Sequence, residues 1–377
     1  MSKILVTKPF QAPYEEVSSE IQRAWDAQWL TNNGPLLNEF EEKLNGFLGT
    51  VDCSIVSNGT IAIQVAIKAL GLSGEIITTP FSYVATTSSI VWEGCTPVFV
   101  DIDSLTFNID IDKIEAAITE KTSAILATHV FGVPCNVEAI ARLADQYNLK
   151  VIYDAAHCFG TEINGKSIMT FGHLSTLSLH ATKLMHCVEG GAIFVNDHSP
   201  KLDSISGKVS PLRYRIDRLR NFGHYGPEIF DGVGINAKNS EIHAAIGLVN
   251  LRYAEEIIAD RARQHDVYNS MLLGNGLKFP HIRENVKWNK SYYPVVFQSE
   301  QEAMHVYNGL LIENIIARRY FYPALNTLPY IKKQGDTPVA SEISKSILCL
   351  PLYFGLENEK ISQISLRILG LCGEFRS

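Results

Sequence analysis

The sequence has no CxxC pair and no even set of cysteines that would suggest a disulfide framework. Its seven cysteines are scattered along the chain, a pattern typical of reduced thiols in a cytoplasmic protein and not of a zinc site. No uninterrupted apolar run reaches the ~20 residues that a membrane span needs, and the N-terminus lacks the apolar segment of a signal peptide. These absences predict a soluble, cytoplasmic protein with no membrane partner.

Positive charge is also scarce. The formal net charge is -7, which disfavours a nucleic-acid-binding surface, although a local basic patch could still bind a phosphorylated ligand. Neither the glycine fingerprint of dinucleotide-binding folds nor a Walker motif occurs, which disfavours an NAD-dependent oxidoreductase. No cluster of side chains has metal-ligand spacing. We therefore expect neither a nucleic acid nor a metal ion as a ligand.

The pattern of hydrophobic residues indicates an α/β fold. Of the 377 residues, 46% are hydrophobic and 19% are charged, as in ordinary globular proteins. Short apolar runs alternate with helical stretches in the first half of the chain, which predicts a mostly parallel sheet of seven strands flanked by helices. The strand-like runs are 53–57, 75–79, 97–100, 124–128, 151–153, 176–179 and 192–195.

The alternation stops near residues 232–238, and a long helical region is expected from about 240 to 273. A strand at 292–297, a helix at 302–313, a loop rich in aromatic residues and prolines, and a closing helix at 358–369 follow. Because the chain is long for a single core, we predict a large domain over residues 1–245 and a smaller α+β domain over residues 246–377.

One lysine stands out in the run from Ser175 to Gly191. Lys183 lies among small and polar residues, with no charged neighbour beside it. An amine in a cramped, partly dry pocket has a lowered pKa and can act as a nucleophile or form a Schiff base. The alternative is a lysine that merely extends from the end of a strand toward solvent.

Two other strand ends carry polar residues. Asp154 ends a buried-looking strand, at the sheet edge where α/β folds bind ligands, although a lone Asp there could equally cap a helix. The turn Ser57-Asn58-Gly59-Thr60 joins a strand to a helix, and its small residues suit an anion such as phosphate. Tyr83, after the next strand, could place its ring over a flat ligand or pack in the core.

Together these residues point to pyridoxal 5'-phosphate. Its phosphate would lie at Gly59 and Thr60, its ring nitrogen at Asp154 and its aldehyde at Lys183. The chemistry of this cofactor needs a lysine Schiff base and an acidic partner for the pyridine nitrogen.

The same motifs resemble the sugar-nucleotide aminotransferases of fold type I, in the aspartate aminotransferase superfamily. The resemblance spans essentially the whole chain. It is carried by Ser178-Leu-His-Ala-Thr-Lys183, Glu189-Gly-Gly191, Asp154-Ala-Ala-His157, Ser57-Asn-Gly-Thr60, Trp29-Leu-Thr-Asn-Asn-Gly-Pro35 and Arg220-Asn-Phe-Gly223. Related dehydratases carry His at the lysine position, so the resemblance favours aminotransfer.

The resemblance implies a role for each matching position. Lys183 would hold the cofactor and move a proton between cofactor and substrate. The cofactor-binding residues would be Gly59, Thr60 and Ser178 at the phosphate, Asp154 at the pyridine nitrogen, Tyr83 stacked on the ring and His157 near the ring or its 3-hydroxyl. Asn221 would reach the phosphate of the cofactor in the other subunit, which implies a homodimer with shared sites.

The resemblance also implies a substrate. Trp29, Thr31, Arg319 and Tyr320 would line the mouth, and Arg318 or Arg319 could meet a nucleotide diphosphate; a solvated helix end is the alternative for both arginines. The stretches 29–35 and 319–323 look most like those of enzymes that aminate dTDP-4-dehydro-6-deoxyglucose at C4 to make an amino sugar of O-antigens and other surface glycans. Glutamate would be the amino donor. Amination at C3 of the isomeric ketone and a cofactor-binding regulatory protein remain the alternatives.

Overall fold

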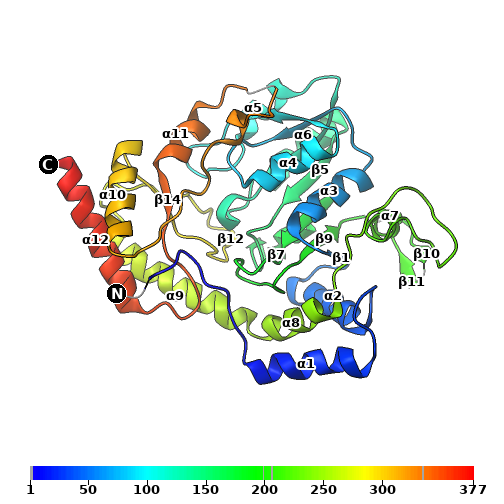
Figure 1. Cartoon of the computed structure of the whole chain (residues 1–377). Coiled ribbons are helices and arrows are strands. Elements are labelled where there is room, and N and C mark those ends of the chain that lie inside the picture. The colour runs from blue at the N-terminus through cyan, green and yellow to red at the C-terminus, as the bar shows by residue number, and fades with distance from the viewer. Residues whose placement is uncertain (1–2, 198, 205–206, 333–334) are drawn as a thin grey trace.

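The computed structural model describes residues 3–197, 199–204, 207–332 and 335–377 (Figure 1). The helices are α1 (Tyr14–Asp26), α2 (Pro35–Leu48), α3 (Gly59–Ala69), α4 (Val84–Trp92), α5 (Ile111–Ile114), α6 (Val137–Tyr147), α7 (Pro211–Leu219), α8 (Glu241–Arg252), α9 (Ala254–Leu272), α10 (Glu300–Ile312), α11 (Pro338–Ser346) and α12 (Asn358–Arg376). Short 3-10 segments occur at Glu115–Ala117, Val130–Gly132, Ile168–Thr170 and Leu325–Thr327.

A sheet of seven strands forms the centre of the larger part of the molecule, in the order β1-β9-β8-β5-β4-β2-β3. Its strands are β1 (Cys53–Val56), β2 (Glu75–Thr78), β3 (Thr96–Phe99), β4 (Thr122–Thr128), β5 (Lys150–Asp154), β8 (Leu174–Ser178) and β9 (Gly191–Val195). Strand β9 pairs antiparallel with both β1 and β8, and the other pairings are parallel. The prediction of a mostly parallel seven-stranded sheet is therefore confirmed.

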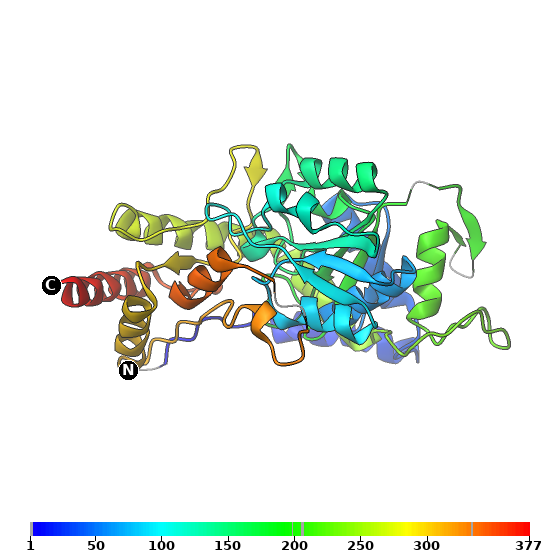
Figure 2. The same ribbon diagram turned by 90° about the horizontal axis from the view of Figure 1, so that it is seen from above.

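Helices cover both faces of this sheet (Figure 2). Alternate strand residues point to opposite faces, so Ile77 and Val151 join a core with α2, α6 and α8, whereas Ile76 and Ile152 join a core with α3, α4 and α7. Burial on both faces explains why the strands read as continuous apolar runs in the sequence. The described residues contain no helix that is long and apolar enough to cross a bilayer.

A second core lies in the C-terminal part, between the end of α9, α10, α12 and a two-stranded sheet of β13 (Pro294–Val296) and β14 (Ile347–Cys349). Helix α9 belongs to both cores, with Ile257 in the core of the large sheet and Tyr268 in the C-terminal one. Helix α8 crosses the expected domain boundary and packs with the large sheet, and the boundary at residue 245 stays a prediction.

Several elements lie outside the helices and strands that we expected. They are α7, α11, the hairpin of β10 (Leu202–Ser204) and β11 (Gly207–Val209), the small sheet of β6 (Glu162–Ile163), β7 (Lys166–Ser167) and β12 (Val286–Lys287), and β14. Most are short, and short segments carry little periodicity. Helix α12 also continues to Arg376, seven residues beyond the expected end of the closing helix.

Candidate active site

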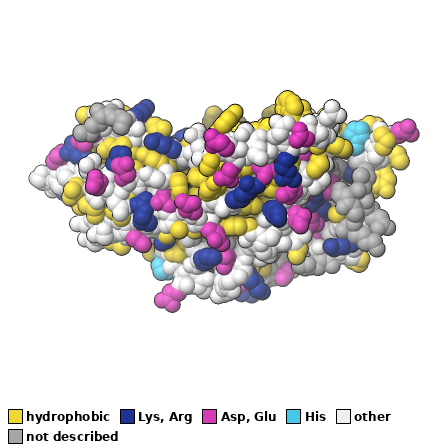
Figure 3. All heavy atoms as spheres, turned by 90° about the horizontal axis from the view of Figure 1, so that it is seen from below, with side chains coloured by type: hydrophobic (Ala, Val, Ile, Leu, Met, Phe, Trp, Pro, Cys, Tyr) yellow, Lys and Arg dark blue, Asp and Glu magenta, His cyan; other side chains and the backbone are white. Residues whose placement is uncertain are grey.

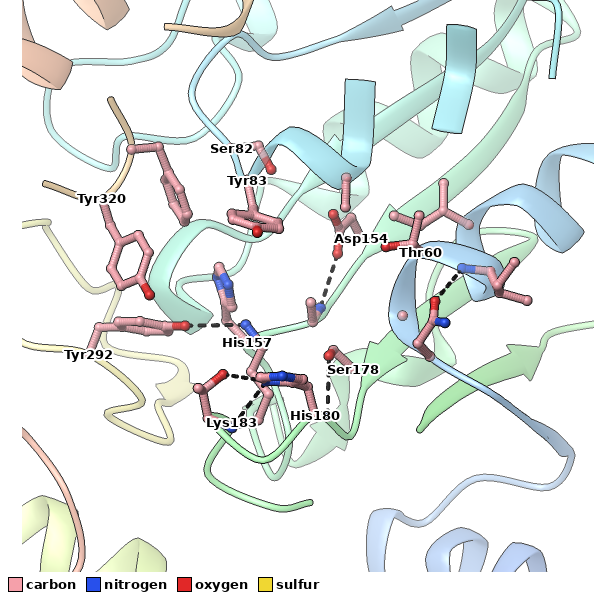
Figure 4. Close-up of a pocket in the computed structure, with 18 of the residues that line it drawn as sticks. Thr60, Ser82, Tyr83, Asp154, His157, Ser178, His180, Lys183, Tyr292 and Tyr320 are labelled. Carbon is pink, nitrogen blue, oxygen red and sulfur yellow. Dashed lines mark hydrogen bonds between the residues drawn. The ribbon is translucent and has the colours of Figure 1, made fainter. Parts of the chain in front are cut away.

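A cavity of about 470 Å³ opens at the carboxyl ends of the parallel strands, a size within the usual range for small-molecule sites. One side, which we call the sheet wall, comprises Asn58, Gly59, Thr60, Ser82, Tyr83, Asp154, His157, Ser178 and Lys183. The opposite side, which we call the C-terminal wall, comprises Tyr292, Arg318, Tyr320 and Phe321. Figure 4 shows side chains of the two walls pointing toward one another.

The start of α3 forms one end of the sheet wall. The side chain of Asn58 caps this helix by accepting a hydrogen bond from the Ile61 N–H at 2.9 Å. Gly59 packs so closely on Ser178 that a Cβ at residue 59 would lie 2.9 Å from the Ser178 Cβ. The first N–H groups of a helix have no partner within the helix. The backbone at Gly59 and Thr60 therefore brings N–H donors beside the Ser178 hydroxyl, an arrangement that suits a phosphate.

Asp154 is buried at the end of β5. Its Oδ2 accepts a hydrogen bond from Thr86 Oγ1 at 2.6 Å, and its Oδ1 accepts one from the Ala156 N–H at 3.2 Å. Burial raises the pKa of the carboxyl, whereas these two hydrogen bonds and the charge of Lys183 oppose the rise. A carboxylate offers about four lone-pair sites, so Asp154 retains acceptor capacity for a further donor.

Lys183 projects toward the C-terminal wall. Its Nζ donates a hydrogen bond to the Tyr292 hydroxyl at 3.3 Å (Figure 4). Burial lowers the pKa of the amine to about 8, and the nearby carboxylate of Asp154 opposes the shift. A substantial neutral fraction is therefore present near neutral pH, as a nucleophilic amine requires.

His157 is the sheet-wall residue whose ring contacts the C-terminal wall. Its ring stacks on Phe321 with centroids 5.7 Å apart and planes 5° apart, and the edge of Tyr292 approaches it at 4.8 Å. Its carbonyl accepts hydrogen bonds from the side chains of Asn289 and Ser291, both at 2.7 Å. Burial and the charge of Lys183 hold the pKa of the imidazole well below its usual value, so the ring is neutral. Its buried Nδ1 has no hydrogen-bond partner among the described residues.

The structure gathers nine of the residues that we singled out from the sequence. Those that line the cavity are Gly59, Thr60, Tyr83, Asp154, His157, Ser178, Lys183, Arg318 and Tyr320. Their individual roles stay predictions.

Four other candidates lie outside this cavity. Arg319 turns away, because its Nη2 donates to Glu300 Oε1 at 2.8 Å and to the Lys345 carbonyl at 2.9 Å; Arg318 lines the cavity instead. Trp29 is 49% exposed, and Thr31 and Asn221 form backbone bridges to Ser240 and Asn236. Within one chain, therefore, the proposed mouth residues other than Tyr320 do not reach the cavity.

Sequence reasoning missed two residues of the C-terminal wall, Tyr292 and Phe321, and also Asn289, whose side chain donates to the His157 carbonyl. The sequence indicated Arg319 and Tyr320 as mouth residues but gave the next residue, Phe321, no role, and Tyr292 entered only as the first residue of an expected strand. An aromatic residue next to a short strand has no local feature that separates a ligand contact from core packing. The contact of Tyr292 with Lys183, which lies 109 residues away in the chain, arises only from the tertiary fold.

The residues fit pyridoxal phosphate. The close approach of Gly59 to Ser178 leaves a cradle that a side chain would fill, Asp154 keeps acceptor capacity in a buried site, and the Nδ1 of His157 is without a partner. Lys183 supplies the amine within the same cavity. The described residues contain no group of three or more His, Cys, Asp or Glu that could hold a metal ion.

Known proteins resemble the chain along its whole length. Residues 12–368 match the model of the DegT/DnrJ/EryC1/StrS aminotransferase family. The chain is 40% identical over 376 residues to a dTDP-4-amino-4,6-dideoxy-D-glucose transaminase of Escherichia coli, covering 97% of this chain and 98% of the relative. It is also 40% identical over 369 residues to an enzyme of that name from Shigella dysenteriae, covering 96% and 97%.

A solved structure of DesI in the presence of its TDP-sugar product is similar in fold. It superposes with a TM-score of 0.92 at 31% identity and covers all of this chain and 94% of DesI.

Proposed function

The chain belongs to the DegT/DnrJ/EryC1/StrS aminotransferase family, and from this premise we propose that it transfers an amino group from glutamate to C4 of dTDP-4-dehydro-6-deoxyglucose. The family that the sequence motifs indicated is thereby confirmed, as is the type of fold. The substrate is supported by one observation above the others, the 40% identity over nearly the full chain to two transaminases named for the corresponding amino sugar.

In this proposal the sheet wall holds pyridoxal phosphate. Gly59, Thr60 and Ser178 would bind its phosphate, Asp154 would accept a hydrogen bond from its ring nitrogen, and Lys183 would attach to its aldehyde. When bound, the group supplies an electron sink for the carbon that loses or gains a proton. Lys183 is suited to move that proton, because burial lowers the pKa of its amine to about 8, close to the working pH that favours acid–base catalysis.

The C-terminal wall would orient the substrates. Tyr292 accepts a hydrogen bond from Lys183 Nζ at 3.3 Å and so fixes the amine that carries the proton. Arg318 is held by backbone hydrogen bonds to Cys349 in both directions, at 3.0 and 2.7 Å. Its guanidinium lies 4.6 Å from the ring centre of Tyr320. It would bind a carboxylate or phosphate of a substrate, as guanidinium forks do.

We propose further that two copies share their sites. Large apolar side chains are exposed on the single chain, and they include Trp29, Trp92, Phe222, Phe230 and Val233. Hydrophobic side chains also gather between charged ones on the face seen in Figure 3. Where exposed apolar side chains form a patch, they mark a protein interface, and a dimer would cover side chains of this kind. A dimer would also bring Asn221, which is remote from the cavity of its own chain, to the cofactor phosphate of the other subunit.

Absorbance spectroscopy of the purified protein tests the cofactor and the donor together. Added pyridoxal phosphate should give a visible band that glutamate abolishes and dTDP-4-dehydro-6-deoxyglucose restores. A protein that stays colourless would overturn the cofactor assignment. A band that only a different amino acid or a different nucleotide sugar alters would replace the donor or the substrate.

Analysis of the product locates the new amine. Proton NMR of the isolated sugar nucleotide should show nitrogen at C4. In this proposal the product then enters surface-glycan synthesis in the cytoplasm. Nitrogen at C3, formed from the isomeric ketone, would contradict the C4 assignment and leave the aminotransferase reaction intact.

A further inference from the structure

Three buried hydroxyl groups form a row that ends on Asp154. Thr128 Oγ1 donates to Ser82 Oγ at 3.0 Å, Ser82 Oγ lies 2.7 Å from Thr86 Oγ1, and Thr86 Oγ1 donates to Asp154 Oδ2 at 2.6 Å. The three residues are at most 1% exposed. They come from the end of β4, the loop after β2 and the first turns of α4, so three separate elements supply the row.

The row has a direction that follows from counting protons. A hydroxyl donates only one proton, and the proton of Thr86 goes to Asp154, so Ser82 must donate to Thr86. Thr128 in turn donates to Ser82. All three O–H dipoles then point toward the carboxylate, and aligned hydrogen bonds in a buried site strengthen one another.

The opposite direction would leave a group without a partner. A protonated Asp154 that donated to Thr86 would reverse the row, and Thr128 would then need an acceptor of its own. Among the residues that the structure describes, Ser82 is the only hydrogen-bond partner of Thr128 Oγ1. A buried hydroxyl proton without an acceptor is costly, so the row favours the ionised carboxylate.

We propose that Thr86, Ser82 and Thr128 are positioning residues that orient the carboxylate of Asp154 and keep it ionised toward the ring nitrogen of pyridoxal phosphate. This inference rests on the proposed function, because it concerns the same cofactor. The row would act on the reaction through Asp154, since a carboxylate that is fixed and charged keeps the ring nitrogen protonated.

Helix α4 offers a matched control. Thr86 and Thr87 are neighbours in this helix, and each is 0% exposed. Thr86 donates to Asp154, whereas the Thr87 hydroxyl has no partner among the described residues. Threonine to valine removes the hydroxyl with almost no change of shape at both sites. Thr87→Val therefore reports the packing cost alone, and Thr86→Val adds the loss of the row.

The experiment measures cofactor affinity and the state of the ring nitrogen in the intact protein. Apo-protein is titrated with pyridoxal phosphate, and the ¹⁵N chemical shift of ¹⁵N-labelled cofactor is recorded for the wild type and each variant. In Thr86→Val we expect the dissociation constant to rise about 10-fold or more and the ¹⁵N shift to move toward the unprotonated nitrogen. Thr87→Val and the conservative Thr86→Ser should match the wild type in both.

The outcomes separate the two proposals. A Thr86→Val protein with wild-type ¹⁵N shift and affinity overturns the positioning role, and so does an equal change in Thr87→Val. If Thr86→Val does not fold, Ser82→Ala decides: a ¹⁵N chemical shift displaced from the wild-type value toward the unprotonated nitrogen supports the row, and a wild-type value overturns it. A wild-type protein that binds no cofactor instead overturns the proposed function itself.

Discussion

The sheet wall and the C-terminal wall of the cavity are built in different ways. Asp154 and Ser178 end two strands of the large sheet, and the helix start at Gly59 follows a third, so a local feature of the sequence places each of them. Tyr292 and Phe321 belong to segments that reach the cavity by packing against distant parts of the chain. The sheet wall supplies the groups that would hold the cofactor. The C-terminal wall would orient groups of the sheet wall, such as the Lys183 amine that contacts Tyr292.

The largest expected effect comes from Lys183, the sheet-wall residue that contacts the C-terminal wall. In Lys183→Ala the rate of aminotransfer should fall on the order of 10⁴-fold, because both the attaching amine and the proton carrier are lost. Steady-state kinetics measures the rate, and borohydride reduction followed by peptide mapping should find no cofactor-labelled lysine. Labelling of another lysine with retained activity would contradict the assignment.

The next largest effect is expected from a buried ion network beside strand β1 of the large sheet. Glu41 accepts hydrogen bonds from Arg213, Arg220 and the Ile55 N–H of β1, at 2.7 to 2.8 Å. Although burial raises the pKa of this carboxyl, the two guanidinium groups and the Ile55 hydrogen bond lower it to about 2. Its folded pKa is thus depressed, so its stabilisation is complete above the usual pKa of a glutamate and is lost as the pH falls toward 2.

In Glu41→Gln the free energy of unfolding at pH 7 should fall by about 1.5–3 kcal/mol, because charge-assisted hydrogen bonds to Arg213 and Arg220 are weakened, although both arginines keep Asp217 as a partner. The acid-dependent loss of stability below pH 5 should also become shallower. Urea denaturation at several pH values measures both effects. The exposed neighbour Glu42→Gln is the control, and equal losses in the two variants would show that the ion network does not stabilise the fold.

A third change tests how tightly the sheet wall is packed. In Gly59→Ala the new Cβ would lie 2.9 Å from the Ser178 Cβ, and this overpacking should cost about 1–3 kcal/mol of cofactor binding or stability. Gly46→Ala is the control, since a Cβ there meets nothing within 4 Å and an alanine in a helix is favoured over glycine. Unchanged cofactor affinity in Gly59→Ala, measured by fluorescence titration, would argue against the phosphate cradle.

The smallest effect tests the C-terminal wall. Tyr292→Phe removes the hydroxyl that accepts a hydrogen bond from Lys183 Nζ at 3.3 Å, and a hydrogen bond of this length contributes about 0.5–1.5 kcal/mol. We expect kcat to fall about 2- to 10-fold with little change in cofactor affinity. Tyr293→Phe is the neighbouring control, because its hydroxyl bonds to Asn269 in the C-terminal core. A loss of cofactor affinity in Tyr292→Phe would place this residue with the sheet wall.

The sequence predicted the sheet and the sheet wall well, because strand periodicity and strand-end residues are local signals. All seven strands of the large sheet lie where apolar runs indicated them, and Asp154 and Lys183 line the same cavity. The C-terminal wall was harder to predict from the sequence, since nothing near Tyr292 in the chain indicates that it contacts Lys183, 109 residues away. The direction of the Arg319 side chain likewise depends on Glu300, which lies before the start of the helix expected at 302–313.

Helix α9 has a consequence for how ligands enter. It runs for 19 residues without proline or glycine from the core of the large sheet into the C-terminal core, and helices bend sharply mainly at such residues. The segment that carries Tyr292 and Arg318 is thus joined to the large sheet by one unbroken helix. We therefore expect the distance between the two walls to change little when a ligand enters or leaves the cavity.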